Sequence, residues 1–306
     1  MNSLIKDQLS WEEFYKKSVV NKKINKIEPF NRLIAHSKNF FLIAGYGAFT
    51  PGYLILITKD FLPAYGLIDK NLDELNFIIQ LTKENISKNL NRKSLIFEHG
   101  MCACIGGLDR AHLHIMSIGN KSSEKSLVQS INRTLYNRKS GIKYIQFKNY
   151  KLENIHDINH FLDPKNIDSK NDSDFKIFGK ILKLNDIKNL NEKKWPGITL
   201  PHIMKGGHYV FLRSDYSNAS FLTTNNFQTQ FGRQVTFENE MFLDILFKKN
   251  IEDIVKSNEF LETWKWQNCK FDKNVIETVN LTKLQLESFK NKYQAEFKEF
   301  EFKVIL

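Results

Sequence analysis

The sequence DRAHLHIM at Asp109–Met116 decides the fold, because two histidines one residue apart interrupt an apolar run that is typical of a β-strand. Successive side chains of a strand point to opposite faces, so we expect Arg110, His112 and His114 to share one face. Imidazole is neutral and nucleophilic, or charged and proton-donating, within the working pH range. A cation and two imidazoles in a row suit chemistry on an anionic centre such as a phosphate. A half-exposed strand that carries two unused histidines is the alternative.

The sequence around this stretch resembles the signature of the histidine triad (HIT) superfamily of nucleotide hydrolases and transferases. The family pattern is His-x-His-x-His followed by two apolar residues, and the resemblance is carried by Phe97–Gly100 and Gly106–Ile115. Upstream, Leu33–Phe41 and Gly45–Lys59 resemble the pair of strands that precedes the signature in that family. The order and spacing agree over roughly residues 30–120.

The resemblance implies a two-step reaction at an α-phosphate. An imidazole attacks phosphorus, a nucleotidyl-histidine forms, and water or another acceptor resolves it. The middle position of the family pattern is the nucleophile, which here is His112. This role needs one ring nitrogen unprotonated and the other donating to a fixed acceptor, often a backbone carbonyl. The third position, His114, corresponds to a donor to the phosphate oxygens, which stabilises the charge that develops in the transition state.

Arg110 stands where the family has its first histidine. A guanidinium does not give up its proton near neutral pH, so a proton-transfer role at this position is in doubt. Arg110 could hold a phosphate or carboxylate with two hydrogen bonds, or it could pair with Asp109 or another acid. Related transferases work with only the His-x-His pair, so the arginine alone does not indicate an inactive site.

Further substrate-binding candidates follow from the resemblance and flank the signature; they are Glu98, His99, Gly106, Gly107, Phe41 and Ile43. The two glycines would let the backbone approach a phosphate, although a tight turn explains them as well. Relatives place a polar residue that contacts ribose or phosphate near Glu98 and His99. In relatives the segment of Phe41 and Ile43 forms the base and ribose pocket, and core packing is the alternative role for both.

The composition indicates a folded protein, and we expect no metal and no other cofactor. With 306 residues and 42% hydrophobic content, the chain can hold two ordinary domains or one large one. It has no apolar run of about 18 residues and no apolar stretch at Met1–Asp7, so we expect a cytoplasmic protein without membrane contact. Three cysteines are too few for a disulfide framework. Cys102, Cys104 and His99 do not have the spacing of a structural zinc site.

The net charge of +11 is compatible with a polyanionic partner. The lysines, however, are scattered among asparagines, isoleucines and phenylalanines, so nucleic acid is a permitted but not a favoured partner. The expected partner is the nucleotide substrate. Because many relatives are dimers, a homodimer is a further expectation from the resemblance.

The periodicity predicts an α+β fold. The resemblance implies that residues 28–150 form a HIT-like catalytic domain with an antiparallel sheet. Strands are expected at 40–44, 53–58, 94–98 and 108–117, and helices after Asp69 or Asn71 and around 123–136, on one side of the sheet. A polar connecting region at 151–194 leads to a C-terminal α+β domain at 195–306. Its strands are expected at 208–212 and 221–223, with helices at 227–247 and 284–297. This part is either a degenerate second HIT repeat or an unrelated accessory domain.

The sequence therefore favours a HIT-type hydrolase that cleaves a nucleoside phosphate or a dinucleoside polyphosphate. A nucleotidyltransferase or phosphorylase with a phosphate or sugar-phosphate acceptor is the first alternative. A nucleotide-binding protein without catalysis and a nucleic-acid end-processing enzyme are the others, and the second of these predicts binding that weakens steeply with salt.

Overall fold

The computed structural model describes residues 16, 19–20, 30–48, 50–60, 71–99, 110–120, 122–137, 143–147, 174–177, 180–183, 208–214, 219–224, 230–242, 265 and 272–305. Its main strands are β3 (Leu33–His36), β4 (Phe40–Ala44), β5 (Leu54–Thr58), β6 (Lys93–His99), β7 (His112–Ile118), β8 (Lys143–Phe147), β11 (His208–Ser214), β12 (Ala219–Thr224) and β13 (Lys303–Val304). Two short pairs are β1 (Val19–Val20) with β2 (Phe30–Asn31), and β9 (Asp174–Ile177) with β10 (Lys180–Lys183). The helices described are α2 (Leu72–Leu90), α3 (Glu124–Asn137), α7 (Phe231–Phe242), α10 (Asp272–Phe289) and α11 (Gln294–Glu299).

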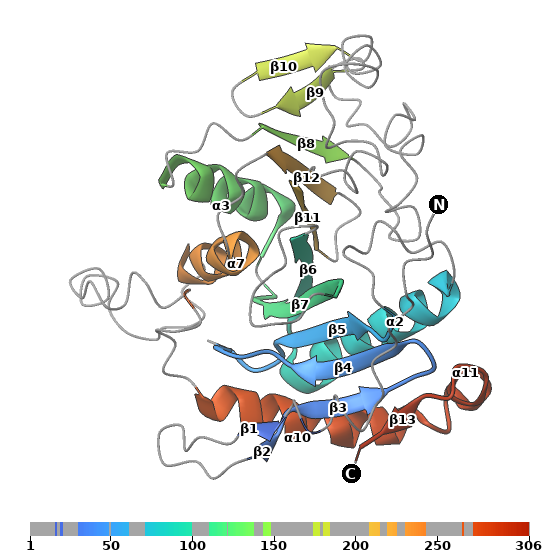
Figure 1. Cartoon of the computed structure of the whole chain (residues 1–306). Helices are drawn as coiled ribbons and strands as arrows, with labels where there is room; N and C mark the ends of the chain where they lie inside the picture. Colours follow the sequence, from blue (N-terminus) through green and yellow to red (C-terminus); the bar gives the residue numbers. More distant parts are fainter. Residues whose placement is uncertain are drawn as a thin grey trace.

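The fold is α+β, as predicted, and it is built on one nine-stranded sheet in the order β13-β3-β4-β5-β7-β6-β11-β12-β8 (Figure 1). Every pairing within this sheet is antiparallel. The central strands β4 and β5 have the sequences FFLIA and LILIT and are buried along their whole length. Such continuous apolar runs form strands that are covered on both faces.

Helices cover both faces of the sheet, so the expectation of helices on one side is wrong. Phe97 of β6 shares a face with His114 of β7, its ladder partner. Helix α7 packs on this face, because a Cβ on Gly232 would lie 2.2 Å from the Phe97 ring. Helix α2 lies on the other face, where its Leu90 approaches Gly52 beside Ser117. The physical reason is the apolar character of both faces of the central strands, each of which must be buried.

Strand β7 begins at His112, whereas the sequence predicted a strand from 108. Arg110 lies in a bend before the strand, and its place on a shared face with the histidines stays a prediction. Two hydrogen bonds hold the chain in this bend. The His112 ring bonds to the carbonyl of Arg110, and the Arg110 guanidinium donates to the carbonyl of Lys59. The last registered pair of β5 and β7 is Ile57 and His112, and one further backbone hydrogen bond, from the Thr58 N–H to the Ala111 carbonyl at 3.2 Å, continues the contact.

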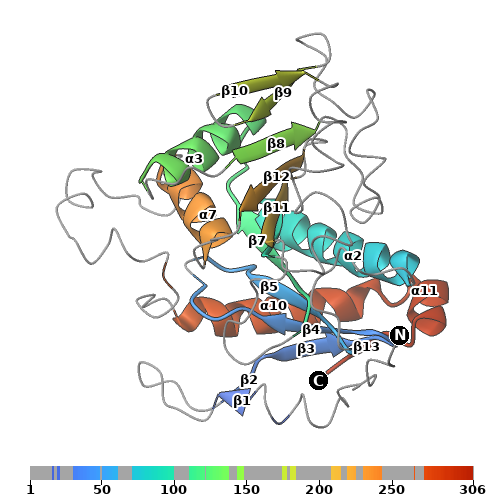
Figure 2. The same cartoon turned by 45° about the horizontal axis from the view of Figure 1, so that its top comes forward.

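The predicted C-terminal strands are confirmed, and they extend the same sheet. Strand β11 pairs with β6 (Figure 1) and with β12. Strand β12 pairs with β8, and β13 pairs with β3 at the opposite edge (Figure 2). Strands from before and after residues 151–194 therefore share one hydrogen-bonded ladder. The division into 28–150, 151–194 and 195–306 and the second HIT repeat stay predictions.

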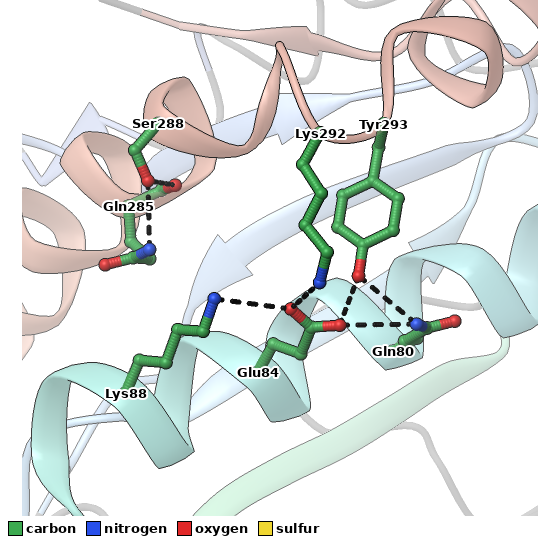
Figure 3. A network of polar contacts seen from close by, with 7 residues as sticks. All are labelled: Gln80, Glu84, Lys88, Gln285, Ser288, Lys292 and Tyr293. Atoms are coloured by element: carbon green, nitrogen blue, oxygen red, sulfur yellow. Dashed lines mark hydrogen bonds and ion pairs between the residues drawn. The ribbon is translucent and has the colours of Figure 1, made fainter.

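Two helices differ from the sequence-based boundaries. The helix expected at 284–297 is divided between α10 and α11 by a turn at residues 290–293. This turn brings Lys292 and Tyr293 onto Glu84 of α2 (Figure 3). The helix expected at 227–247 is α7, which runs over 231–242 within the described residues. None of the described helices is long and apolar enough to cross a membrane.

Candidate active site

The two signature histidines lie side by side on one face of β7. His112 pairs with Ile57 of β5 and His114 with Ile55, so both side chains project on the same side of the sheet. Their ring centroids are 4.9 Å apart and the ring planes meet at 73°. His112 is buried, and His114 keeps part of its surface exposed. The alternation predicted from the sequence is therefore confirmed for this pair.

His112 has the hydrogen bond that a nucleophilic imidazole requires. Its Nδ1 lies 2.9 Å from the backbone oxygen of Arg110. A carbonyl oxygen only accepts, so Nδ1 carries the hydrogen and Nε2 of the neutral ring has the free lone pair. Burial lowers the pKa of His112, although the hydrogen bond to Arg110 opposes this effect. The ring is thus neutral at pH 7, with its lone pair on Nε2.

His114 is held by a phenol and an aromatic stack. Its Nδ1 lies 2.7 Å from the hydroxyl of Tyr53, and its ring stacks on Phe97 at a centroid distance of 4.5 Å and an angle of 11°. Burial, followed by the electrostatic influence of the ionisable groups of His112, His99 and Arg233, holds the pKa of His114 well below its usual value. His114 is therefore also neutral at pH 7, and it has one hydrogen to donate.

His99 lies close to the pair, but Glu98 does not. His99 follows Phe97 by two residues on β6 and thus shares its face, and its ring centroid is 6.2 Å from that of His114. The backbone N–H of Gly232, at the start of α7, donates to His99 Nε2 at 3.2 Å. Glu98 is buried on the opposite face of the strand. The sequence-based prediction placed Glu98 and His99 together, although adjacent side chains of β6 point to opposite faces of the strand.

The structure also places the substrate-binding candidates Arg110, Phe41 and Ile43 relative to the histidines. Arg110 Nη1 donates to the Lys59 carbonyl at 2.6 Å, so the contact described for this side chain is with the backbone. Phe41 lies in register with Ile57, and Ile43 with Ile55, so both share the histidine face one strand further from β7. Both are fully enclosed, which agrees with core packing. Gly106 and Gly107 lie outside the described residues, as does Asp109.

Sequence reasoning missed Tyr53 and Arg233. Tyr53 precedes Ile55 and Ile57 by even spacings, so the alternation in residues 53–58 could have placed it on the histidine face. Arg233 comes from α7, far along the chain, and no local pattern indicates its place. Its guanidinium donates to the carbonyls of Tyr46 at 3.1 Å and Gly47 at 2.7 Å.

Among the described residues no group of three or more His, Cys, Asp or Glu side chains is arranged to hold a metal ion. Cys102 and Cys104 are not among them. No family model and no curated protein matches the chain. The resemblance to the HIT superfamily therefore depends on the sequence motif that contains His112 and His114.

Proposed function

We propose that the protein is a HIT-type nucleotide hydrolase that cleaves a nucleoside phosphate or dinucleoside polyphosphate at the α-phosphate through a nucleotidyl-His112 intermediate. The observation that carries the proposal is the hydrogen bond from His112 Nδ1 to the Arg110 carbonyl. It leaves Nε2 unprotonated in a buried ring beside a second neutral imidazole, that of His114.

In the first step Nε2 of His112 attacks the α-phosphorus, and the bond to the leaving oxygen breaks. The imidazole becomes positively charged as the new bond forms, and the Arg110 carbonyl, which accepts from Nδ1, stabilises that charge. His114 donates its hydrogen to a phosphate oxygen as negative charge develops there. Water then displaces the nucleotidyl group from His112, and the free imidazole is restored.

The test is a screen of nucleotides and dinucleoside polyphosphates, with mass spectrometry of the intact chain after rapid quenching. We expect a nucleotidyl adduct on His112 and release of a nucleoside monophosphate. His112→Ala should abolish both while the far-UV circular dichroism stays unchanged. The matched control is His36→Ala on β3, which pairs with Phe41 away from the signature strand and should leave both intact.

The acceptor is decided in the same experiment. Water, inorganic phosphate and sugar phosphates are compared as the second substrate, and faster product formation with either of the latter indicates a phosphorylase or nucleotidyltransferase instead. Nucleotide binding with no adduct and no product from any acceptor would contradict catalysis and favour a binding protein. Full turnover by His112→Ala would refute the assigned nucleophile.

A further inference from the structure

A hydrogen bond between Tyr53 and His114 has no part in the chemistry above. Tyr53 is buried, and its hydroxyl oxygen lies 2.7 Å from His114 Nδ1. The phenol ring has a fixed place, because a Cβ on Gly45 would lie 2.4 Å from Tyr53 Cε1 and only glycine admits the ring there. The Gly45 N–H also donates to the Tyr53 carbonyl at 2.9 Å. Both the backbone and the ring of Tyr53 are therefore held against His114.

Arg233 determines which partner donates in this hydrogen bond. Its guanidinium carbon lies 5.3 Å from the centroid of the Tyr53 ring. Burial raises the pKa of Tyr53 despite the opposing charge and hydrogen bond of Arg233, so the phenol keeps its hydrogen at neutral pH. A guanidinium has only donors, so Arg233 offers the phenol hydrogen no acceptor, whereas His114 Nδ1 lies 2.7 Å from the phenol oxygen. The hydrogen of the phenol is then directed to its other partner, Nδ1 of His114.

We infer that Tyr53 and Arg233 are positioning residues that hold His114 as the tautomer with its hydrogen on Nε2. The Tyr53 hydroxyl donates to Nδ1 at 2.7 Å, which places the single hydrogen of the neutral ring on the other nitrogen. The inference rests on the proposed function, in which His114 donates to a phosphate oxygen. The donor is then in place before the substrate arrives, so no proton has to move during the chemical step.

Helix α7 supports this arrangement at two neighbouring residues. Gly232 lies directly against the Phe97 ring, on which His114 stacks, and Arg233 holds the carbonyls of Tyr46 and Gly47. The stack fixes the ring plane of His114, and the guanidinium fixes the loop before Tyr53. A helix from the C-terminal part of the chain thus sets the geometry of a site whose imidazoles come from the N-terminal part.

The tautomer can be measured directly on the full chain. Two-bond ¹H–¹⁵N correlation spectra of protein labelled with ¹⁵N-histidine distinguish the two neutral tautomers, and His114→Asn identifies the signal among the 8 histidines. We expect the Nε2–H tautomer of His114 at pH 7. Tyr53→Phe should give a mixture of tautomers or the Nδ1–H form. Tyr46→Phe removes a phenol from the same loop, one that faces Arg32, and should leave the tautomer unchanged.

Turnover provides the second measurement. Tyr53→Phe should lower kcat about tenfold or more with little change in KM, because only the orientation of a donor is lost. Arg233→Gln should lower kcat as well. The double variant should lower kcat by no more than the larger of the two single effects, because both residues act on the same hydrogen bond between Tyr53 and His114.

An Nδ1–H tautomer in the unsubstituted protein overturns the inference, and this measurement needs no variant to fold. An unchanged tautomer in Tyr53→Phe, or an equal change in Tyr46→Phe, overturns the role of Tyr53, and additive effects overturn that of Arg233. The tautomer is read without any substrate. Failure of the proposed function, seen as no adduct on His112, is therefore distinguishable from failure of this inference.

Discussion

At His112, burial and one backbone hydrogen bond act on the same ring and define its reactive form. Burial lowers the pKa below 6.5, so the ring stays neutral at pH values where an exposed histidine is largely protonated. We therefore expect the acidic limb of the kcat/KM profile to fall below pH 6.5. Measurement of kcat/KM over about pH 5 to 8 checks this. An acidic limb with an apparent pKa of 6.5 or above would count against a buried His112 as the nucleophile.

The pH dependence of folding provides the control for that profile. Below pH 6.5 the unfolded chain binds a proton at residue 112 that the folded chain does not, so stability decreases as the pH falls from 6.5 towards the lower folded-state pKa. Urea unfolding at each pH shows whether lost activity reflects unfolding or protonation of the nucleophile. An acidic limb that follows the unfolded fraction would mean that the profile reports stability alone.

Strand alternation explains which site residues the sequence could predict. The shared face of His112 and His114 follows from the period of two along β7, and the same rule excludes Glu98 from that face. The bend at Arg110 depends on the Lys59 carbonyl, a contact with another strand that no local pattern contains. Arg233 depends on α7 packing over β6, which is a tertiary arrangement. Local periodicity therefore predicts on which face of a strand a side chain lies, but it does not predict the contacts between elements that are distant in the sequence.

At the scale of elements, the contact between α7 and β6 leaves no space at Gly232. A Cβ there would lie 2.2 to 2.6 Å from three atoms of the Phe97 ring, so α7 or the ring must move in Gly232→Ala. We expect a loss of about 1–3 kcal/mol in the free energy of unfolding, together with reduced turnover. Urea denaturation measures the first effect. Phe97→Leu should relieve part of the clash, so the losses of unfolding free energy in Gly232→Ala and Phe97→Leu should not add in the double variant. Additive losses would contradict this explanation.

The contact between α2 and the turn before α11 is polar and pH-dependent. Tyr293, Lys292 and Gln80 hydrogen-bond to Glu84 (Figure 3). Partial burial alone would raise the pKa of Glu84, but these bonds outweigh it and lower the pKa from 4.5 to about 2. The stabilisation is complete above pH 4.5 and is lost as the pH falls towards about 2.

Tyr293→Phe should therefore lower the free energy of unfolding by about 1 kcal/mol at pH 7. The difference from the unsubstituted protein should shrink in acid, because protonated Glu84 no longer gains from the phenol. Urea unfolding at several pH values measures both effects. Ser288→Ala is the control, since that hydroxyl bonds within α10 to Gln285. A difference for Tyr293→Phe that stays constant down to about pH 2 would exclude Glu84 as its origin.

At the scale of the whole molecule, one sheet contains strands from both sides of the polar connecting region. Strand β6, which carries His99, has β7 on one side and the C-terminal β11 on the other, and β3 has β13 at its outer edge. Helix α10 adds a hydrogen bond from the Gly52 N–H to Thr278 at 2.8 Å. Such shared ladders favour a single cooperative unfolding transition, whereas separate domains could unfold separately.

We therefore expect the far-UV circular dichroism of the full chain and its adduct formation on His112 to be lost at the same urea concentration. A fragment of residues 1–150 should not fold, because β6 loses its partner β11 and the parts of the sheet that α7 and α10 cover are exposed. Circular dichroism and urea titration of the fragment beside the full chain make the comparison. A fragment that unfolds cooperatively and still forms the adduct would show that residues 28–150 are a self-sufficient catalytic domain, and that the C-terminal strands only extend its sheet.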